Sequence, residues 1–244
     1  MTKWVWRGLR TGIKTTTYPR TQETTPGVSP GRPADTRFSR EEDAGAVVHL
    51  CPTGALRSVK DEVLVNRELC IHCSRCRQRD SVSNGWEDGF EWSRFTKEGH
   101  GLGGPFSRSL HIRVLDAGAC GACMSEIKQI TGPYYNIHRL GFFITPTPRA
   151  ADILLVAGPL TEHMAGALRK TYEAMPLPKK VIAVGTCALS GGVFGTGFAS
   201  RGGIGEAVPI DIKVPGCPPP PLAIVHALLL AAGKRTLDAG KERQ

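Results

Sequence analysis

Cysteine is the residue type in this 244-residue chain with the clearest capacity for chemistry, and its eight copies fall into two sets of four. The first set joins the run CIHCSRC to an earlier Cys-Pro, and the second joins one C-x2-C pair to two isolated cysteines. The sets are Cys51, Cys70, Cys73 and Cys76, then Cys120, Cys123, Cys187 and Cys217. The charged N-terminus lacks the apolar core of a secretory signal, so we expect a cytoplasmic chain. Disulfides are rare in that compartment, and the pattern therefore predicts two four-thiolate metal sites.

The first set has the spacing of an iron–sulfur motif. Bacterial ferredoxins hold a [4Fe–4S] cluster with such a triplet and with a Cys-Pro that lies elsewhere in the chain. Cys51 precedes Pro52 and would be that fourth ligand, whereas His72, inside the triplet, is expected to be a loop side chain. A structural zinc site is the alternative, although zinc more often uses two separated C-x2-C pairs.

The cysteines of the second set follow apolar segments with the character of strands. HIRVLD precedes Cys120, KKVIAVG precedes Cys187, IDIKVPG precedes Cys217, and ADILLVAG predicts one more strand. In an open parallel α/β sheet, the loops after the strands converge on one crevice, so these four thiols are predicted to share a site. Cysteines that are merely buried are the alternative interpretation. The segment LAIVHALLLAAG is apolar on every side and predicts a buried helix.

These elements predict four parts in the chain. Residues 1–40 form a basic amphipathic arm and linker, and residues 41–80 form a small ferredoxin-like α+β module with a strand–turn–strand between its cysteine motifs. Residues 81–107 form a connector, and residues 108–244 form an α/β domain with a parallel sheet. The connector has four aromatic residues that would anchor it: Trp86, Phe90, Trp92 and Phe106. They would pack either against a partner or onto the chain's own two modules.

The arm carries eight Lys or Arg against two Asp or Glu, within a formal net charge of +9 for the chain. Trp6, Leu9 and Ile13 recur at helical spacing among these cations, which is typical of an interfacial or partner-docking helix. A flexible basic tail is the alternative. No apolar run reaches the roughly 18 residues of a membrane span. Nucleic acid is not an expected partner, because the rest of the chain does not interleave basic and aromatic residues.

Four motifs, DAGACGACMSE, PTPRAADILLVAGPLTEHM, GTCALSGG and PGCPPPP, resemble the small, proximal-cluster subunit of membrane-bound group 4 [NiFe]-hydrogenases and the homologous 20 kDa B subunit of respiratory complex I. The resemblance covers about residues 108–234, and the N-terminal third is similar to a ferredoxin-type subunit of the same complexes. It implies a flavodoxin-like α/β domain whose second cysteine set holds one [4Fe–4S] cluster beside a large subunit's active site. The C-x2-C spacing favours the hydrogenase branch, because complex I proteins have adjacent cysteines there.

The resemblance implies an electron-transfer subunit of an oxidoreductase, with two [4Fe–4S] clusters and no independent catalysis. Electrons would pass between a ferredoxin-type subunit or soluble carrier and a hydrogenase-like large subunit. The arm would contact membrane-arm subunits on the inner face of the cytoplasmic membrane. A complex I-like, quinone-linked oxidoreductase subunit is one alternative, and a zinc-stabilised interaction module is the other.

Two further side chains are candidates for a role near the second cysteine set. Glu126 follows Cys123 by three residues and matches an acidic residue near the cluster in the family, which suggests proton or redox coupling. Its alternative role is that of a carboxylate that stabilises the start of a helix. His163 follows a predicted strand on the cysteine side and is the one histidine in a position of interest.

Overall fold

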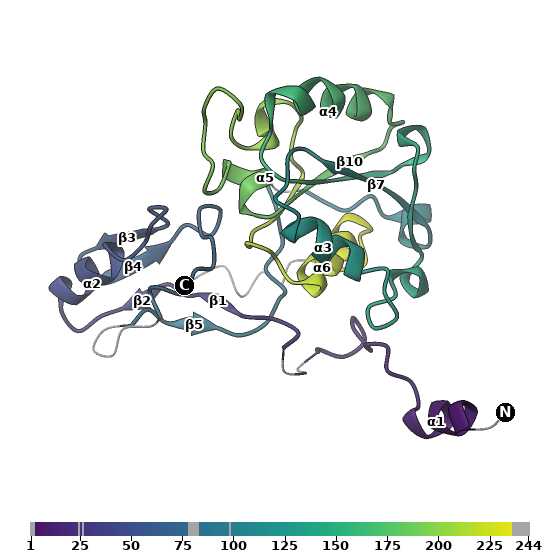
Figure 1. The fold of residues 1–244 in the computed structure, drawn as a ribbon, viewed down its shortest axis with the longest axis horizontal. Helices are drawn as coiled ribbons and strands as arrows, with labels where there is room; N and C mark the ends of the chain where they lie inside the picture. The colour runs from purple at the N-terminus through teal and green to yellow at the C-terminus, as the bar shows by residue number, and fades with distance from the viewer. Residues whose placement is uncertain (1–2, 24, 26, 78–82, 98, 236–244) are drawn as a thin grey trace.

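A computed structural model describes residues 3–23, 25, 27–77, 83–97 and 99–235 (Figure 1). Its main element is a six-stranded sheet in the order β6-β11-β10-β9-β7-β8. The strands are β6 (Arg94–Phe95), β7 (Leu110–Asp116), β8 (Phe142–Ile144), β9 (Ile153–Ala157), β10 (Lys180–Val184) and β11 (Ile212–Val214). All neighbours pair in parallel except β6 with β11. Without β6, the order from β8 to β11 is 2-1-3-4-5, which is that of flavodoxin-like sheets. The mostly parallel α/β architecture is thus confirmed.

Helices cover both faces of this sheet (Figure 1). Alternate residues of β9 point to opposite faces: Ile153 and Leu155 pack with α3 and α6, whereas Leu154 packs with α4 and α5. The helices are α3 (Ala122–Gln129), α4 (Glu162–Ala174), α5 (Thr186–Ser190) and α6 (Pro221–Ala231). Strands buried on both sides have continuous apolar sequences, as β9 and β10 do. All of α6 is buried, as its sequence predicts.

A smaller α+β part precedes this domain. It has α2 (Glu41–Val48) and an antiparallel sheet in the order β2-β4-β3, made of β2 (Thr36–Arg37), β3 (Leu56–Val59) and β4 (Glu62–Val65). The predicted strand–turn–strand is therefore present, and Val47, Leu56 and Val63 form its small core. The border between residues 80 and 81 falls within 78–82, outside the described residues. The remaining short elements are β1 (Arg32–Pro33), β5 (Trp86–Glu87), η1 (Gly104–Ser107), η2 (Ile137–Leu140), η3 (Pro148–Ala150) and η4 (Ile204–Glu206).

The connector and the arm contribute to the core of the α/β domain. Phe90 and Trp92 are buried there, and the Trp92 Nε1–H donates to the Pro215 carbonyl at 2.9 Å. Tyr18 from the arm is fully buried against Phe90, with ring centroids 5.0 Å apart. Phe106 also packs on this core. The connector aromatics Phe90, Trp92 and Phe106 thus pack onto the chain's own fold.

Helix α1 (Lys3–Thr11) stands apart from the rest of the molecule (Figure 1). None of its residues is buried. Across the described residues, no helix is long and apolar enough to cross a membrane.

Candidate metal centres

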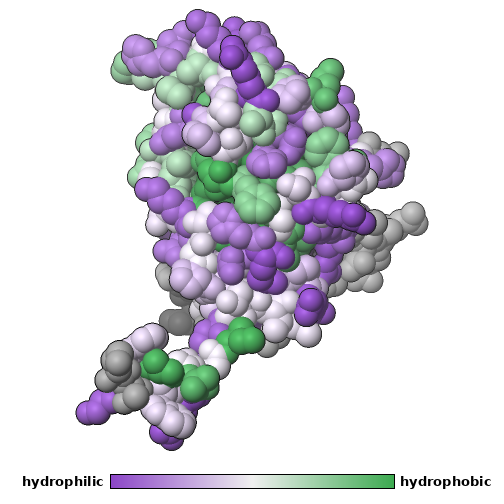
Figure 2. All heavy atoms as spheres, turned by 90° about the vertical axis from the view of Figure 1, so that its right-hand side faces the viewer, coloured by the Kyte–Doolittle hydropathy of each residue, from purple (hydrophilic) through white to green (hydrophobic). Residues whose placement is uncertain are grey.

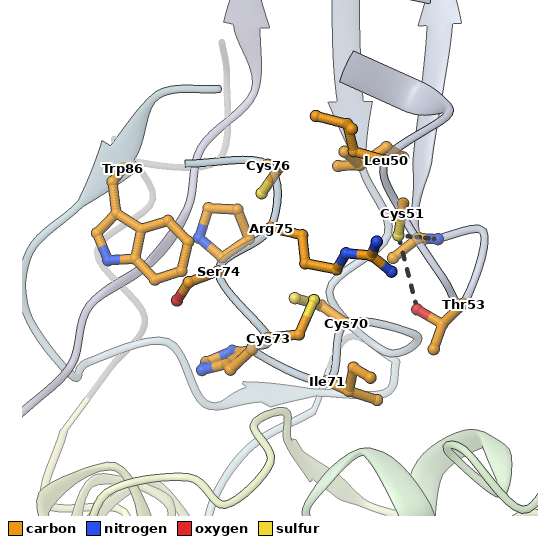
Figure 3. A pocket seen from close by; sticks show the side chains of 14 residues that line it. Leu50, Cys51, Thr53, Cys70, Ile71, Cys73, Ser74, Arg75, Cys76 and Trp86 are labelled. Carbon is orange, nitrogen blue, oxygen red and sulfur yellow. Dashed lines mark hydrogen bonds between the residues drawn. The ribbon is translucent and has the colours of Figure 1, made fainter. Parts of the chain in front are cut away.

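The first cysteine set lines one pocket. Cys51 lies just after α2, and its three partners lie on the loop that follows β4. The pocket encloses about 360 Å³ of empty space, part of it open to solvent. Figure 3 shows the Cys51 sulfur facing the loop that holds Cys70, Cys73 and Cys76. The loop is tightly curled, since His72 and Ser74 both adopt positive φ.

Hydrogen bonding and burial act differently on the thiols of this pocket. Burial, together with the charges of the neighbouring cysteines, raises the pKa of the Cys70 thiol to about 11. The pKa of Cys51 is lowered instead: burial raises it, but donors from Thr53, Ala55 and Leu56 outweigh burial. The Ala55 N–H lies 3.2 Å from the Cys51 sulfur. Such donors stabilise a sulfur that carries negative charge, whether as a free thiolate or as a metal ligand.

The second set gathers at the carboxyl edge of the parallel sheet. Cys120 and Cys123 follow β7, Cys187 lies in the first turn of α5 after β10, and Cys217 lies between β11 and α6. Burial, and after it the charges of Cys187, Cys217 and Cys120, raise the pKa of Cys123 to about 12. The thiols are therefore close enough to interact electrostatically, at the edge where such sheets bind ligands.

Two glycines make room for the sulfur atoms of the second set. Gly185 has a φ of +89°, and a Cβ there would lie 2.6 Å from the Cys123 sulfur. Gly192 has a φ of +57°, and a Cβ there would lie 2.7 Å from the Cys187 sulfur. Both the backbone conformation and the space exclude a side chain, which explains the glycines around Cys187 in the sequence.

The separation of the thiols bears on the size of the group that they could hold. Among the residues that the structure describes, no three or more His, Cys, Asp or Glu side chains are close enough together to hold a metal ion. A four-iron cluster is wider than one ion, and its ligands stand farther apart. The first site, with four thiols around one pocket and a backbone donor on Cys51, and the second, with glycines packed against the sulfurs of Cys123 and Cys187, both fit such a cluster.

The two sites touch each other through α5. The Thr186 hydroxyl donates to the Cys70 carbonyl at 2.7 Å, and the Ser190 hydroxyl donates to the Glu68 carbonyl at 2.9 Å. The Glu68 carboxylate accepts from Lys213 at 2.9 Å and from Arg94 at 2.8 Å. Although burial raises the pKa of Glu68, these two cations lower it below its ordinary value. Sequence analysis did not single out Thr186 or Glu68, although each lies within two residues of a cysteine.

The other candidate side chains differ in their surroundings. Glu126 lies on α3, and burial raises its pKa; its charge in turn raises the pKa of Cys123. His163 is exposed on α4. His72 packs edge-on between Trp86 and Trp92, and burial followed by the charge of Arg32 lowers its pKa. Glu126 is thus coupled to the cysteines, whereas His163 is solvent-exposed.

The fold and the positions of the thiols define a class of protein: an α/β domain with flavodoxin-like strand order and cysteine loops at the carboxyl edge of its sheet. Residues 120–231 match the family described as the NADH ubiquinone oxidoreductase 20 kDa subunit. The chain is 45% identical over 127 residues to an uncharacterized protein of Methanocaldococcus jannaschii. The matched region covers 52% of this chain and 85% of that protein. The chain belongs to this family of oxidoreductase subunits, as its motifs predicted. The match does not include the cysteines before residue 120.

Two solved structures show weaker likeness. One is the membrane-bound sulfane sulfur reductase, an archaeal respiratory membrane complex, with 27% identity, a TM-score of 0.46, and coverage of 52% of this chain and 73% of that chain. The other is an NAD⁺-reducing [NiFe]-hydrogenase in the H2-reduced state, with 21% identity, a TM-score of 0.39, and coverage of 48% and 88%. TM-scores below 0.5 support no finer comparison.

Proposed function

We propose that this chain is the electron-transfer subunit of a membrane-associated [NiFe]-hydrogenase complex and carries a [4Fe–4S] cluster at each cysteine site. The clusters would supply one-electron redox chemistry. Cys51, Cys70, Cys73 and Cys76 would hold the first cluster, and Cys120, Cys123, Cys187 and Cys217 the second. The observation that carries the proposal is the hydrogen bond that joins the surroundings of the two sites, from the hydroxyl of Thr186, next to Cys187, to the Cys70 carbonyl.

The chain's own residues would bind and shield the clusters rather than perform catalysis. Four thiolates per cluster leave no open coordination position for a substrate. Substrate chemistry would therefore belong to a large subunit, with this chain as its electron carrier.

The exposed cysteines indicate where partners would dock. In each set one thiol is exposed: Cys73 in the first and Cys120 in the second. A ferredoxin-type subunit or a soluble iron–sulfur carrier would approach Cys73, and the large subunit would approach Cys120. The loop after α5 exposes Val193, Phe194 and Phe198, which suit a protein interface on the large-subunit side.

The complex would lie on the inner face of the cytoplasmic membrane, with the basic arm on the side of the membrane and of the membrane-arm subunits. Membership in the family of the NADH ubiquinone oxidoreductase 20 kDa subunit also supports a second candidate, a quinone-linked oxidoreductase subunit. The large subunit that binds this chain distinguishes the two candidate functions. Nickel in the co-purified large subunit together with H2 oxidation supports the hydrogenase, whereas quinone reduction without nickel supports the alternative.

The first experiment is iron and acid-labile sulfide analysis with low-temperature EPR on anaerobically purified full chain, co-expressed with its large subunit. We expect about eight iron and eight sulfide per chain and two cubane signals. Cys70→Ser should remove one signal, and Cys187→Ser the other. About four of each, with the signal sensitive only to Cys187→Ser, would limit the proposal to the second site. Zinc without sulfide would contradict it and favour the zinc-stabilised module.

A further inference from the structure

Helix α1 has a composition and exposure that the electron-transfer function does not explain. Trp4, Trp6 and Leu9 are 76%, 70% and 72% exposed, and Ile13, just beyond the helix, is 92% exposed. Figure 2 shows hydrophobic residues, in green, on a projection that extends away from the body of the molecule. Large apolar side chains gathered on one projecting element indicate a surface that binds something.

The described part of the fold does not bury α1. The helix has nine residues and buries none of them. Isolated helices shorter than about 12 residues are marginal in water even when their sequence favours the helix. A stable α1 therefore requires an external surface that accepts its apolar face.

Apart from Trp4, the large side chains of α1 divide into two adjoining strips. At 3.6 residues per turn, Trp6, Leu9 and Val5 fall on one side, and Ile13 continues that side if the turn is extended. The cations fall beside them and comprise Lys3, Arg7, Arg10 and Lys14. The first carboxylate in the chain is Glu23, so the segment of α1 carries no acidic side chain of its own.

We propose that α1 lies in the headgroup region of an anionic lipid bilayer, with its apolar strip toward the acyl chains and its cations among the lipid phosphates. Tryptophan favours such interfaces, because its ring is apolar while its N–H remains able to donate to water or headgroups. Lysine and arginine bury their aliphatic stems and keep their charge at the headgroup level. A fluid anionic surface attracts each cation separately, whereas a protein groove would need a carboxylate placed opposite each one.

The short segment after α1 ties this lipid contact to the body. The Thr16 N–H donates to the Tyr134 carbonyl at 2.9 Å, and Tyr18 is buried in the α/β core with its hydroxyl on Glu91 at 2.8 Å. Only a few residues separate α1 from this attachment, so the α/β domain would be held close to the bilayer. The inference deepens the proposed membrane placement, but it does not depend on the clusters.

The test is flotation of the purified full chain with vesicles of phosphatidylcholine alone and with vesicles that also contain phosphatidylglycerol. We expect binding to the phosphatidylglycerol vesicles that weakens as salt is raised. Trp6→Ser should abolish most of this binding. Trp4→Ser is the matched control, because Trp4 lies on the side of the helix away from Trp6, and it should retain binding. Neither substitution should change the thermal unfolding of the body, since α1 buries no residue.

Charge variants separate lipid binding from non-specific attraction. Arg7→Gln and Arg10→Gln should each lower the vesicle partition coefficient by roughly fivefold, which is the effect of one cation near an anionic surface. Arg57→Gln on β3 makes the same change in charge on an exposed site of the body and should leave binding unchanged.

Binding that survives both Trp6→Ser and the arginine substitutions would overturn the inference, and so would absence of binding to phosphatidylglycerol vesicles. Loss of a co-purified membrane subunit from Trp6→Ser, without vesicle binding by the wild type, would assign α1 to a protein partner instead. Iron and sulfide content measured on the same samples tests the proposed function separately, because vesicle binding requires neither cluster.

Discussion

Burial opposes the ionisation of Cys70 and Cys76 at the first site and of Cys123, Cys187 and Cys217 at the second, because it raises the pKa of each of these thiols. Burial raises the pKa of Cys70 and Cys123, and the charge of neighbouring cysteines raises it further. Four thiolates at one site therefore need a compensating positive charge, which a bound metal group would provide. Cys51 is different, because backbone donors lower its pKa despite its partial burial.

In the metal-free chain, this difference should appear as a difference in reactivity. Cys51 and Cys70 are both partly exposed, but only Cys51 has a lowered pKa. At neutral pH a larger fraction of Cys51 is thiolate, so iodoacetamide should alkylate it before Cys70. Raising the pH toward about 11 should reduce the difference, as Cys70 ionises. Mass spectrometry of timed samples measures both alkylation rates. Equal rates at neutral pH would contradict the difference in pKa between Cys51 and Cys70.

Gly185 should tolerate no side chain. Gly185→Ala places a methyl group 2.6 Å from the Cys123 sulfur and forces alanine into a φ of +89°. We expect loss of iron at the second site with iron retained at the first, and a lower unfolding temperature. Gly166→Ala in α4 is the control: a Cβ there meets nothing within 4 Å. That change should stabilise the chain by about 0.5–1 kcal/mol.

At the scale of elements, α5 joins the two cysteine sites. Its first residue, Thr186, is 1% exposed and donates to the Cys70 carbonyl, while its N–H donates to the Gly216 carbonyl beside Cys217. One turn later Ser190 donates to the Glu68 carbonyl. A helix of five residues thus connects loops that carry cysteines of both sets.

Thr186→Val should weaken this connection with little change in shape. It removes the hydroxyl and leaves the Cys70 carbonyl without that donor, which we expect to cost about 1–3 kcal/mol in the free energy of unfolding. Hydrogen exchange should increase in the loop of residues 70–77. Thr186→Ser retains the hydroxyl and should preserve protection of the loop. Equal exchange in the valine variant and the wild type would show that the bond does not order the loop.

At the scale of the whole molecule, the arm and the connector belong to the core of the α/β domain. Tyr18, Phe90 and Trp92 are buried among its helices and strands. The folded unit therefore includes residues on both sides of the border placed at residue 108. Removing the N-terminal third would uncover this part of the core.

Tyr18→Ala should consequently destabilise the α/β domain, although Tyr18 lies in the basic arm. Removal of a fully buried aromatic side chain costs about 3–5 kcal/mol. Tyr18→Phe keeps the ring and loses only the hydrogen bond to Glu91, so about 1 kcal/mol is expected. Denaturant unfolding monitored by circular dichroism measures both values. If Tyr18→Ala lowered the free energy of unfolding by less than Tyr18→Phe does, the arm would not support the core.

Much of the α/β domain could be predicted from local sequence. The continuous apolar segments of β9 and β10 indicate strands buried on both faces, and α6 is apolar on every side. The positions of the cysteines after strands predict convergence at one edge, because parallel strands all end there. The family also followed from four local motifs.

Only the tertiary structure decided how the parts of the chain meet. Neither Tyr18 nor Thr186 carries a local pattern that indicates its partner, since Glu91 and Cys70 lie 73 and 116 residues away. Phe90, Trp92 and Phe106, which could have faced a partner, pack instead on the chain's own core, while α1 remains uncovered by the described residues. Periodicity reports which face of an element is apolar, but the surface that covers this face depends on contacts between segments far apart in the sequence.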